Sequence, residues 1–169
     1  MKENISKLLN EQINKELYSA YLYLSFSNYY IESGLAGFAH WYQIQAQEER
    51  DHAMLMVQYL QNNEKKVTFE TIEKPQNTWA DGLEVLKTGL AHEKFITDSI
   101  NTIYHTASEE RDYRTVQFLD WFVKEQGEEE TNVVDIIKKM ELFGSDPKGL
   151  YMLDKELVLR VYAAPSLVL

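Results

Sequence analysis

Residues 45–52 read QAQEERDH and lie in the middle of a stretch, from about Leu35 to Asn62, whose apolar residues recur at helical spacing. At the alternating four–three spacing of a helical-bundle seam, Gln45, Glu49 and His52 take positions where a plain bundle has Leu or Ile. An unpaired carboxylate in such a core costs on the order of several kcal/mol, so a partner has to compensate Glu49. This stretch therefore predicts a helix with a polar site on its buried side.

Three other periodic stretches are interrupted in the same way. Their seams carry Glu16 in the first stretch, Glu93 in the third, and Gln126 and Glu129 in the fourth. The last three of these follow Glu16, Glu49 and His52 by 77 residues, so the chain reads as two helical hairpins of similar design. Each hairpin holds its polar groups about equally far from its turn, and at about 1.5 Å per residue a small register error moves them little. We therefore expect four helices to bring these polar groups to one level of one core.

Turn and loop signals between these stretches set the expected helix boundaries. We expect long helices over residues 4–32, 35–63, 78–107 and 110–143, and a short fifth helix over residues 147–163. Gly34 is expected as the C-terminal residue of the first helix. Thr78, with Asp81 three residues later, is expected as the N-cap of the third helix. The fold class is then all-α, with a single domain over residues 1–169.

The connection over residues 63–77 bears on the topology. Fifteen residues at about 3.3 Å each span roughly 50 Å, which is enough to run the full length of a bundle helix. Such a crossover makes the second and third helices parallel. A slack loop between antiparallel neighbours is the alternative.

Composition excludes several classes of protein. The chain has 169 residues, a net charge of −10 and no cysteine. The negative charge disfavours nucleic acids and anionic membranes as partners. The missing thiols exclude disulfide scaffolds, zinc ribbons and rubredoxin-type iron centres. No apolar run approaches the roughly 18–20 residues that cross a bilayer, and the start, MKENISKLLN, is too polar for a signal peptide, so we expect a cytoplasmic protein.

The spacing of the polar seam residues indicates a metal site. Glu49 and His52 are three residues apart and share a helix face, as do Gln126 and Glu129. Oxygen ligands with one imidazole suit two cations that share a carboxylate, and this set favours iron or manganese over zinc. The alternative is an internal network of salt bridges and hydrogen bonds. It is disfavoured because no Lys or Arg lies on the four seams to neutralise the carboxylates.

The chain resembles the prokaryotic non-haem ferritins over residues 4–160. The resemblance rests on the segments NEQINKE (10–16), EERDH (48–52), HE (92–93), WFVKEQGEEE (121–130) and GLY (149–151). Ferritin-like di-iron proteins are known for a Glu from each of two helices and Glu-x-x-His motifs from the other two. The resemblance implies a ferritin-like four-helix bundle with one long crossover loop and a short fifth helix. It further implies an iron-storage ferroxidase that oxidises Fe(II) with O2 and stores ferric mineral in a homo-oligomeric cage of about 24 subunits.

The resemblance also assigns roles to individual residues. Glu16, Glu49 and His52 would bind one iron ion. Glu49 would bridge to a second iron, which Glu93 and Glu129 also bind, with Gln126 beside it. Glu48, Glu125 and Glu128, together with Glu129, match a third iron site of bacterial members. Tyr23 matches the tyrosine that hydrogen-bonds near the centre and donates an electron, with Trp121 as its aromatic neighbour.

Two departures from relatives argue against haem. Haem-binding bacterioferritins carry a Met directly after the Glu of the second helix, and this chain has Arg50 there. Their fourth-helix motif ends in His, and this chain has Glu129. The resemblance therefore implies iron without haem.

Three alternatives to iron storage follow from other ferritin-like proteins. A rubrerythrin-type di-iron peroxidase needs a second Glu-x-x-His motif and usually a Cys-rich module, and the chain has neither. A DNA-protecting mini-ferritin is disfavoured by the charge of −10, the absence of a basic tail and the fifth helix. A metal-free shell is disfavoured by the complete ligand set. The apolar residues 161–169 either line a fourfold axis of the cage or are disordered.

Overall fold

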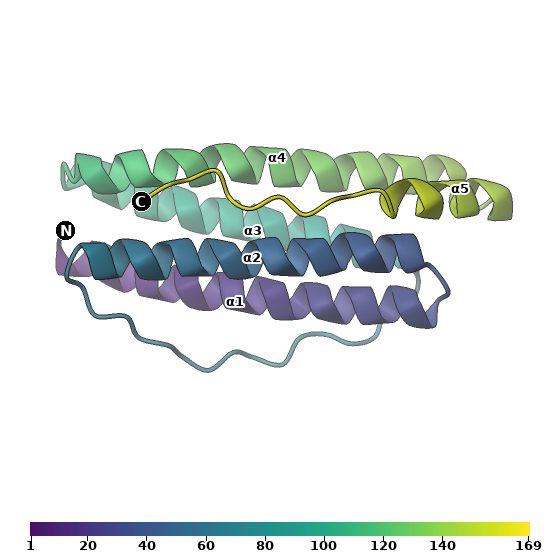
Figure 1. Cartoon of the computed structure of the whole chain (residues 1–169), viewed down its shortest axis with the longest axis horizontal. Coiled ribbons are helices and arrows are strands. Elements are labelled where there is room, and N and C mark those ends of the chain that lie inside the picture. The colour runs from purple at the N-terminus through teal and green to yellow at the C-terminus, as the bar shows by residue number, and fades with distance from the viewer.

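The computed structural model describes residues 1–169 and contains five helices and no strands. The long helices are α1 (Glu3–Glu32), α2 (Ala36–Asn62), α3 (Gly82–Glu109) and α4 (Tyr113–Phe143), and the short helix is α5 (Pro147–Leu157). The four long helices lie side by side, and the connection from α2 to α3 runs the length of the bundle, so that α2 and α3 are parallel (Figure 1). This arrangement confirms the predicted all-α four-helix bundle with a crossover. None of the helices is both long enough and apolar enough to span a membrane.

The helix ends follow local capping chemistry. Gly34 has φ +77°, and the Leu35 N–H donates to the Tyr30 carbonyl at 2.9 Å, which closes the end of α1 as predicted. The N-cap of α3 is Asp81, and the expectation of Thr78 at this position is wrong. The Asp81 carboxylate accepts from the Glu84 N–H at 2.8 Å, while the Glu84 carboxylate accepts from the Ala80 N–H at 2.5 Å. This reciprocal pair satisfies free donors at the helix start, so α3 begins only at Gly82.

Polar side chains on α1 hold the crossover loop against the bundle. The Asn10 side chain accepts from the Thr68 N–H at 2.7 Å and donates to the Lys66 carbonyl at 3.1 Å. Nearer the other end of α1, the Ser25 hydroxyl donates to the Gln76 carbonyl at 2.8 Å. The loop is therefore tied to α1 at both ends of its path.

The buried apolar residues form two clusters with a polar layer between them. On α1, one cluster ends at Ile13 and the other begins at Leu22. On α2, one cluster extends to Ala46 and the other starts at Ala53, so Glu49 lies between them. The same gap occurs on α3 and α4. Two apolar regions thus fix the four helices above and below one polar layer, which is where the seam residues meet.

Helix α5 is fixed to the start of α2 by a buried aspartate. The Asp154 carboxylate accepts from the backbone N–H groups of Gly37 at 2.7 Å and Phe38 at 3.1 Å. The N-cap of α2 itself, Leu35, offers no capping side chain, so Asp154 satisfies these donors from a distant part of the sequence. A Cβ atom on Gly37 would lie 1.7 Å from the Asp154 carbonyl oxygen, so only glycine allows this contact.

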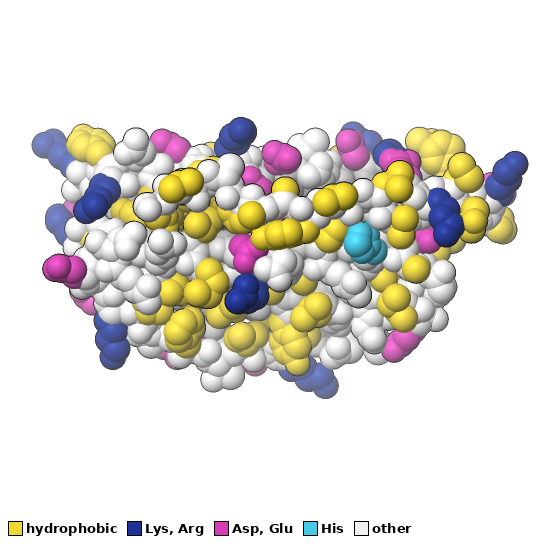
Figure 2. Space-filling model, in the orientation of Figure 1, with side chains coloured by type: hydrophobic (Ala, Val, Ile, Leu, Met, Phe, Trp, Pro, Cys, Tyr) yellow, Lys and Arg dark blue, Asp and Glu magenta, His cyan; other side chains and the backbone are white.

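Residues 158–169, called the tail below, leave α5 and run back along the bundle between α2 and α4 (Figure 1). The expected helix over residues 147–163 therefore ends early, at Leu157. The space for the tail exists because no Cα atom of α2 lies within 8 Å of one of α4. Hydrophobic side chains follow the line of the tail across this face (Figure 2). The tail is thus an extended segment that covers the wide side of the bundle.

Candidate metal centre

The polar layer contains a cluster of ligand-type side chains from all four long helices, called the inner centre below. Its members are Glu16 on α1, Glu49 and His52 on α2, Glu93 on α3 and Glu129 on α4. All are buried, and Glu129 is the most exposed at 6%. The structure thus brings together these five predicted ligands, although they are far apart in the sequence.

The inner centre divides into two groups that share one carboxylate. Ligand atoms of Glu16, Glu49 and His52 lie within 4.8 Å of one another, and so do those of Glu49, Glu93 and Glu129. Glu49 belongs to both groups. This geometry suits two neighbouring cations with Glu49 between them.

The inner centre holds four carboxylates without a lysine or arginine as counter-charge. Its one ion pair joins His52 Nδ1 and a Glu49 oxygen at 3.8 Å. One oxygen of Glu16 and one of Glu129 are buried without any hydrogen-bond partner. Such orphaned charged atoms are rare in folded proteins, and here each has the chemistry of a cation ligand.

Amide and hydroxyl donors hold the other carboxylate oxygens in place. Gln12 donates to Glu16 at 2.8 Å. Gln45 donates to Glu129 at 3.0 Å and to Glu49 at 3.3 Å. These donors orient the carboxylates while leaving the unpaired oxygens free to bind a cation. Gln12 was not expected as part of the site, although its spacing of four residues from Glu16 is a signal that the sequence offers.

Gln126 and Tyr23 both contact Glu93. The Gln126 amide donates to a Glu93 side-chain oxygen at 3.2 Å, so it lies beside the inner centre. The Tyr23 hydroxyl also donates to Glu93. The expectation that Trp121 is the aromatic neighbour of Tyr23 is wrong, because the Trp121 ring packs on His52 with centroids 5.4 Å apart. Tyr23 instead packs on rings that include Tyr42, at 5.6 Å.

Burial and mutual repulsion alter the proton affinity of the inner carboxylates. Burial, together with the charge of neighbouring Glu93, raises the pKa of Glu49 well above its usual value. Burial and the charge of Glu49 do the same to the pKa of Glu129. Burial also raises the pKa of Glu93. Without a cation, these groups therefore bind protons more tightly than exposed glutamates do.

A second group of acids, Glu48, Glu125 and Glu128, lies next to the inner centre and is called the outer cluster below. These residues line a hollow of about 260 Å³ on the wide side of the bundle, together with His52 and Glu129 of the inner centre. Ligand atoms of His52, Glu125 and Glu129 also lie within 4.8 Å of one another. The hollow therefore leads from the outer cluster to the inner centre.

The tail contributes an arginine to this hollow. The Arg160 guanidinium donates to the Glu48 carboxylate and, at 2.9 Å, to the Gln45 side-chain oxygen. It also lies over the Trp41 ring, 4.3 Å from the centroid. Burial lowers the pKa of Arg160 from its usual value. Sequence reasoning missed this residue, although Arg160 is the one charged residue between positions 158 and 169.

Comparisons with known proteins agree with this geometry. A family model described as a ferritin-like domain matches residues 6–143. The chain is 39% identical to the bacterial non-heme ferritin of Campylobacter jejuni, over 92% of this chain and 93% of that protein. It is 37% identical to the bacterial non-heme ferritin of Escherichia coli, over 93% of this chain and 95% of that protein. An open-pore ferritin from the archaeon Archaeoglobus fulgidus matches 95% of this chain and 99% of its own at 40% identity, with a TM-score of 0.93.

Proposed function

This chain belongs to the ferritin family, whose members store iron, and we propose that it is an iron-storage ferroxidase. It oxidises Fe(II) with O2 at the inner centre, and the ferric product is stored as mineral in a shell of about 24 copies of the chain. Iron is both the substrate and the stored cargo.

The observation that carries the proposal is the uncompensated charge of the inner centre. The inner centre contains four buried carboxylates and only one imidazole. One oxygen of Glu16 and one oxygen of Glu129 have no hydrogen-bond partner. Two divalent cations would balance four carboxylates and satisfy both orphaned oxygens. Carboxylates with a single imidazole match the preferences of Fe(II), which takes hard oxygen and imidazole ligands.

Each group of ligands has a distinct task in the proposed reaction. Glu16, Glu49 and His52 bind one Fe(II), and Glu49 bridges to a second ion that Glu93 and Glu129 bind. The two ions would each give one electron to O2, which takes up two protons and leaves as hydrogen peroxide, and each ion would become Fe(III), a harder cation that carboxylates stabilise.

The residues around the ligands keep them in position during this change of charge. Gln12 and Gln45 hold Glu16 and Glu129 by their amides, and Gln126 and the Tyr23 hydroxyl hold Glu93. The resemblance to ferritins implies that Tyr23 donates an electron. We assign it this role because its hydroxyl contacts Glu93, a ligand of the second ion.

The outer cluster is the proposed third iron site and the path by which iron enters or leaves. Glu48, Glu125 and Glu128 lie at the mouth of the hollow, and Glu129 and His52 lie at its inner end. A cation that moves along this line passes from one carboxylate to the next without crossing an apolar barrier. Haem has no place in the proposal, because Arg50, which stands where bacterioferritins carry Met, is exposed and pairs with Asp51.

An apolar groove on the opposite side of α2 supports assembly with further copies. It lies between α1, α2 and the crossover loop, and Tyr21, Leu24 and Ile72 contribute to it. Tyr21 and Leu24 are each about half exposed, which is unfavourable for an isolated bundle. A second copy docked here would bury these side chains. Size-exclusion chromatography with light scattering is expected to give a particle of about 24 subunits, and a monomer or dimer would contradict the shell.

The oxidation itself is tested by mixing the iron-free protein anaerobically with Fe(II) and then with O2. His52→Ala removes the one imidazole of the inner centre, so we expect the initial oxidation rate to fall roughly 10–100-fold. His105→Ala is the matched control, because the His105 side chain is 73% exposed, pairs with Glu109 and lies twelve residues beyond Glu93 on α3. Equal rates in wild type and His52→Ala would refute the proposed reaction.

A further inference from the structure

The outer cluster differs from the inner centre in having a positive charge from its own chain. We propose that Arg160 is the built-in cation of the outer cluster, and that it competes with a third metal ion for Glu48. The third site is then available only when the tail moves Arg160 away. This inference rests on the proposed function for the identity of the competing ion.

The guanidinium is held in one place by several contacts with α2. One of its nitrogens donates to Glu48, and the other donates to Gln45 at 2.9 Å and to the Trp41 carbonyl at 3.2 Å. Its planar face lies on the Trp41 ring. The side chains of Arg160 and Glu48 are only 20% and 18% exposed, so solvent screens their ion pair poorly. This geometry makes Arg160 a fixed charge rather than a mobile surface residue.

A metal ion bound to Glu48 and the guanidinium at this place exclude each other. Both need the same carboxylate, and two positive groups within a few ångströms repel strongly in a half-buried hollow. The ligand atoms of His52, Glu125 and Glu129, which lie within 4.8 Å of one another along the hollow, are a separate sign that a cation is accommodated there. The competition is therefore for Glu48, while Glu129 is left free.

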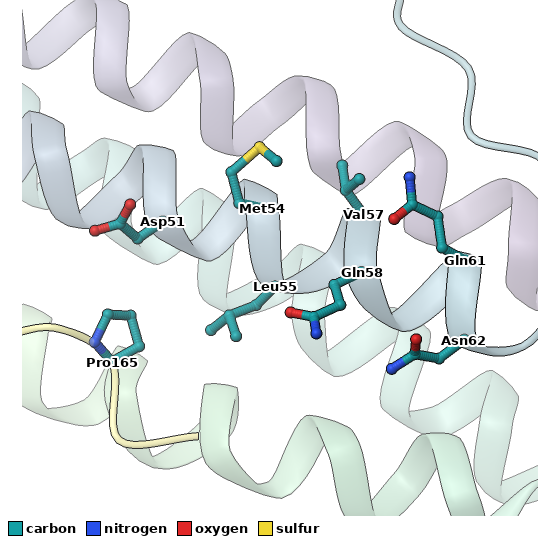
Figure 3. Close-up of a pocket in the computed structure, with 8 residues that line it drawn as sticks. All are labelled: Asp51, Met54, Leu55, Val57, Gln58, Gln61, Asn62 and Pro165. Atoms are coloured by element: carbon teal, nitrogen blue, oxygen red, sulfur yellow. The ribbon is translucent and has the colours of Figure 1, made fainter. Parts of the chain in front are cut away.

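The tail is built so that it can be displaced without disturbing the bundle. Beyond Arg160 its polar anchors are side-chain contacts: the Tyr162 hydroxyl donates to Asp51 at 2.6 Å, and the Trp121 indole N–H donates to the Ser166 hydroxyl at 3.0 Å. Pro165 lies beside a hollow formed by α2, with Asp51 and Leu55 on the facing surface (Figure 3). No ladder of backbone hydrogen bonds holds residues 161–169. Such a segment opens more easily than a helix of the core.

Arg160 also connects the outer cluster to the inner centre. Because it donates to the Gln45 oxygen, the Gln45 amide nitrogen is left to donate to Glu49 and Glu129. Arg160 is therefore a positioning residue for Gln45 as well as the partner of Glu48. Its departure would free Gln45 to turn, so that the two regions respond to each other.

The test is calorimetric titration of the assembled, full-length, iron-free protein with Zn²⁺, which is redox-inert and binds carboxylate and imidazole ligands. In the wild type we expect two tight sites per subunit and a weak third one. Arg160→Gln should tighten the third site by about tenfold or more, because Glu48 loses its competitor. Arg160→Lys keeps the charge and should restore the weak third site. Lys87→Gln, which removes an exposed cation paired with Glu141, is the control and should match the wild type.

Other outcomes would overturn the inference. Equal third-site affinity in wild type and Arg160→Gln would do so, and so would a third site in Arg160→Lys as tight as that in Arg160→Gln. Adding Glu48→Gln to Arg160→Gln should abolish the gain, and a gain that persists in the double variant would contradict the role of Glu48.

Anomalous difference maps from Zn²⁺-soaked crystals give a second, direct readout. In Arg160→Gln we expect a zinc peak at Glu48, and in the wild type such a peak should occur only where Arg160 has left that carboxylate. A zinc ion on Glu48 with Arg160 still in contact would overturn the competition. The same titration separates failure of this inference from failure of the proposed function. A wild type without tight inner sites would contradict the di-iron reaction, and the effect of Arg160→Gln on zinc binding at Glu48 would still be measured.

Discussion

The inner centre and the outer cluster are adjacent and built mainly from glutamate, yet only the outer cluster forms an ion pair with an arginine of its own chain. Glu16, Glu49, Glu93 and Glu129 form no ion pair with a lysine or arginine, whereas Glu48 pairs with Arg160. An external cation would neutralise the inner carboxylates, whereas Glu48 is already partly neutralised by Arg160. Under the proposed function, metal binds the inner centre directly but has to displace a residue from the outer cluster.

The origin of this difference is geometric. The inner carboxylates lie in a layer between two apolar clusters and come from four packed helices, and of the four only Glu129 lines the hollow that the tail covers. The outer cluster lies on the side where α2 and α4 are too far apart for close backbone contact, and the tail fills that side. Only there can a segment outside the bundle deliver an arginine.

The largest expected effect comes from removing the shared ligand of the inner centre. Glu49→Gln should lower the Fe(II) oxidation rate by roughly 100-fold, because both proposed iron positions lose a charged ligand. The same change should raise the unfolding free energy of the metal-free protein by about 1–3 kcal/mol, since it removes one of four buried carboxylates that repel one another. Urea denaturation of the metal-free protein checks the second effect. Lower stability of the variant would show that Glu49 is compensated within the chain.

Substitution of two glycines, Gly37 and Gly127, tests the outer cluster separately from the inner centre. In Gly37→Ala the new Cβ would lie 1.7 Å from the Asp154 carbonyl oxygen, so α5 and its tail have to shift. We expect a loss of about 1–3 kcal/mol in stability and a stronger third Zn²⁺ site, with Fe(II) oxidation at the inner centre retained. Gly127→Ala is the matched control, because its Cβ would have no neighbour within 4 Å. It should gain about 0.5–1 kcal/mol as a helix-interior substitution.

Proton release on metal binding tests whether the inner carboxylates have raised pKa values. Glu49 and Glu129 bind protons more tightly in the folded, metal-free protein than in the unfolded chain. Their contribution to stability is therefore complete below the unfolded pKa of about 4.3 and is lost as the pH rises through the folded pKa. Binding of Zn²⁺ near neutral pH should displace protons from these carboxylates, and the number displaced should fall as the pH is raised. Calorimetry in buffers of different ionisation enthalpy measures it, and a release that grows with pH would contradict the assignment.

The smallest expected effect concerns Tyr23. Tyr23→Phe removes the hydroxyl that donates to Glu93 but keeps the ring against Tyr42. We expect the unfolding free energy to change by about 1 kcal/mol and the oxidation rate to fall only several-fold. Stopped-flow absorbance of ferric product is the measurement. A loss as large as that of Glu49→Gln would make Tyr23 an essential electron donor rather than a supporting one.

The bundle and the inner ligands could be predicted from the sequence because both follow from helical periodicity. Glu16, Glu49, His52 and Glu93 interrupt apolar seams, and a seam position translates directly into a buried position at a known height. The length of the connection permitted the crossover but left a slack loop open, and the resemblance to ferritins favoured the crossover. These features depend on local spacing, which is visible in one sequence.

The tail could not be predicted because its contacts are long-range and follow no period. Arg160 meets Glu48 across 112 residues, and Asp154 meets Gly37 across 117. The helix expected over 147–163 ends at Leu157, beyond which the chain is held by individual side chains in a groove that exists only after the bundle has formed. The misplaced partner of Tyr23 has a similar origin. Trp121 shares the α4 face that turns toward His52 and the tail, and helix spacing does not show which neighbouring ring it meets.

The most direct test of the central claim is a crystal structure of the protein loaded anaerobically with Fe(II), with anomalous data collected at the iron edge. The uncompensated carboxylates predict two iron peaks per subunit in the polar layer. Glu16 and His52 should bind one iron, Glu93 and Glu129 the other. Glu49 should bind both. In the same crystal, Arg160 should remain on Glu48 wherever no third iron is bound. An empty polar layer in iron-loaded crystals, with the four carboxylates satisfied by other groups of the chain, would contradict the account.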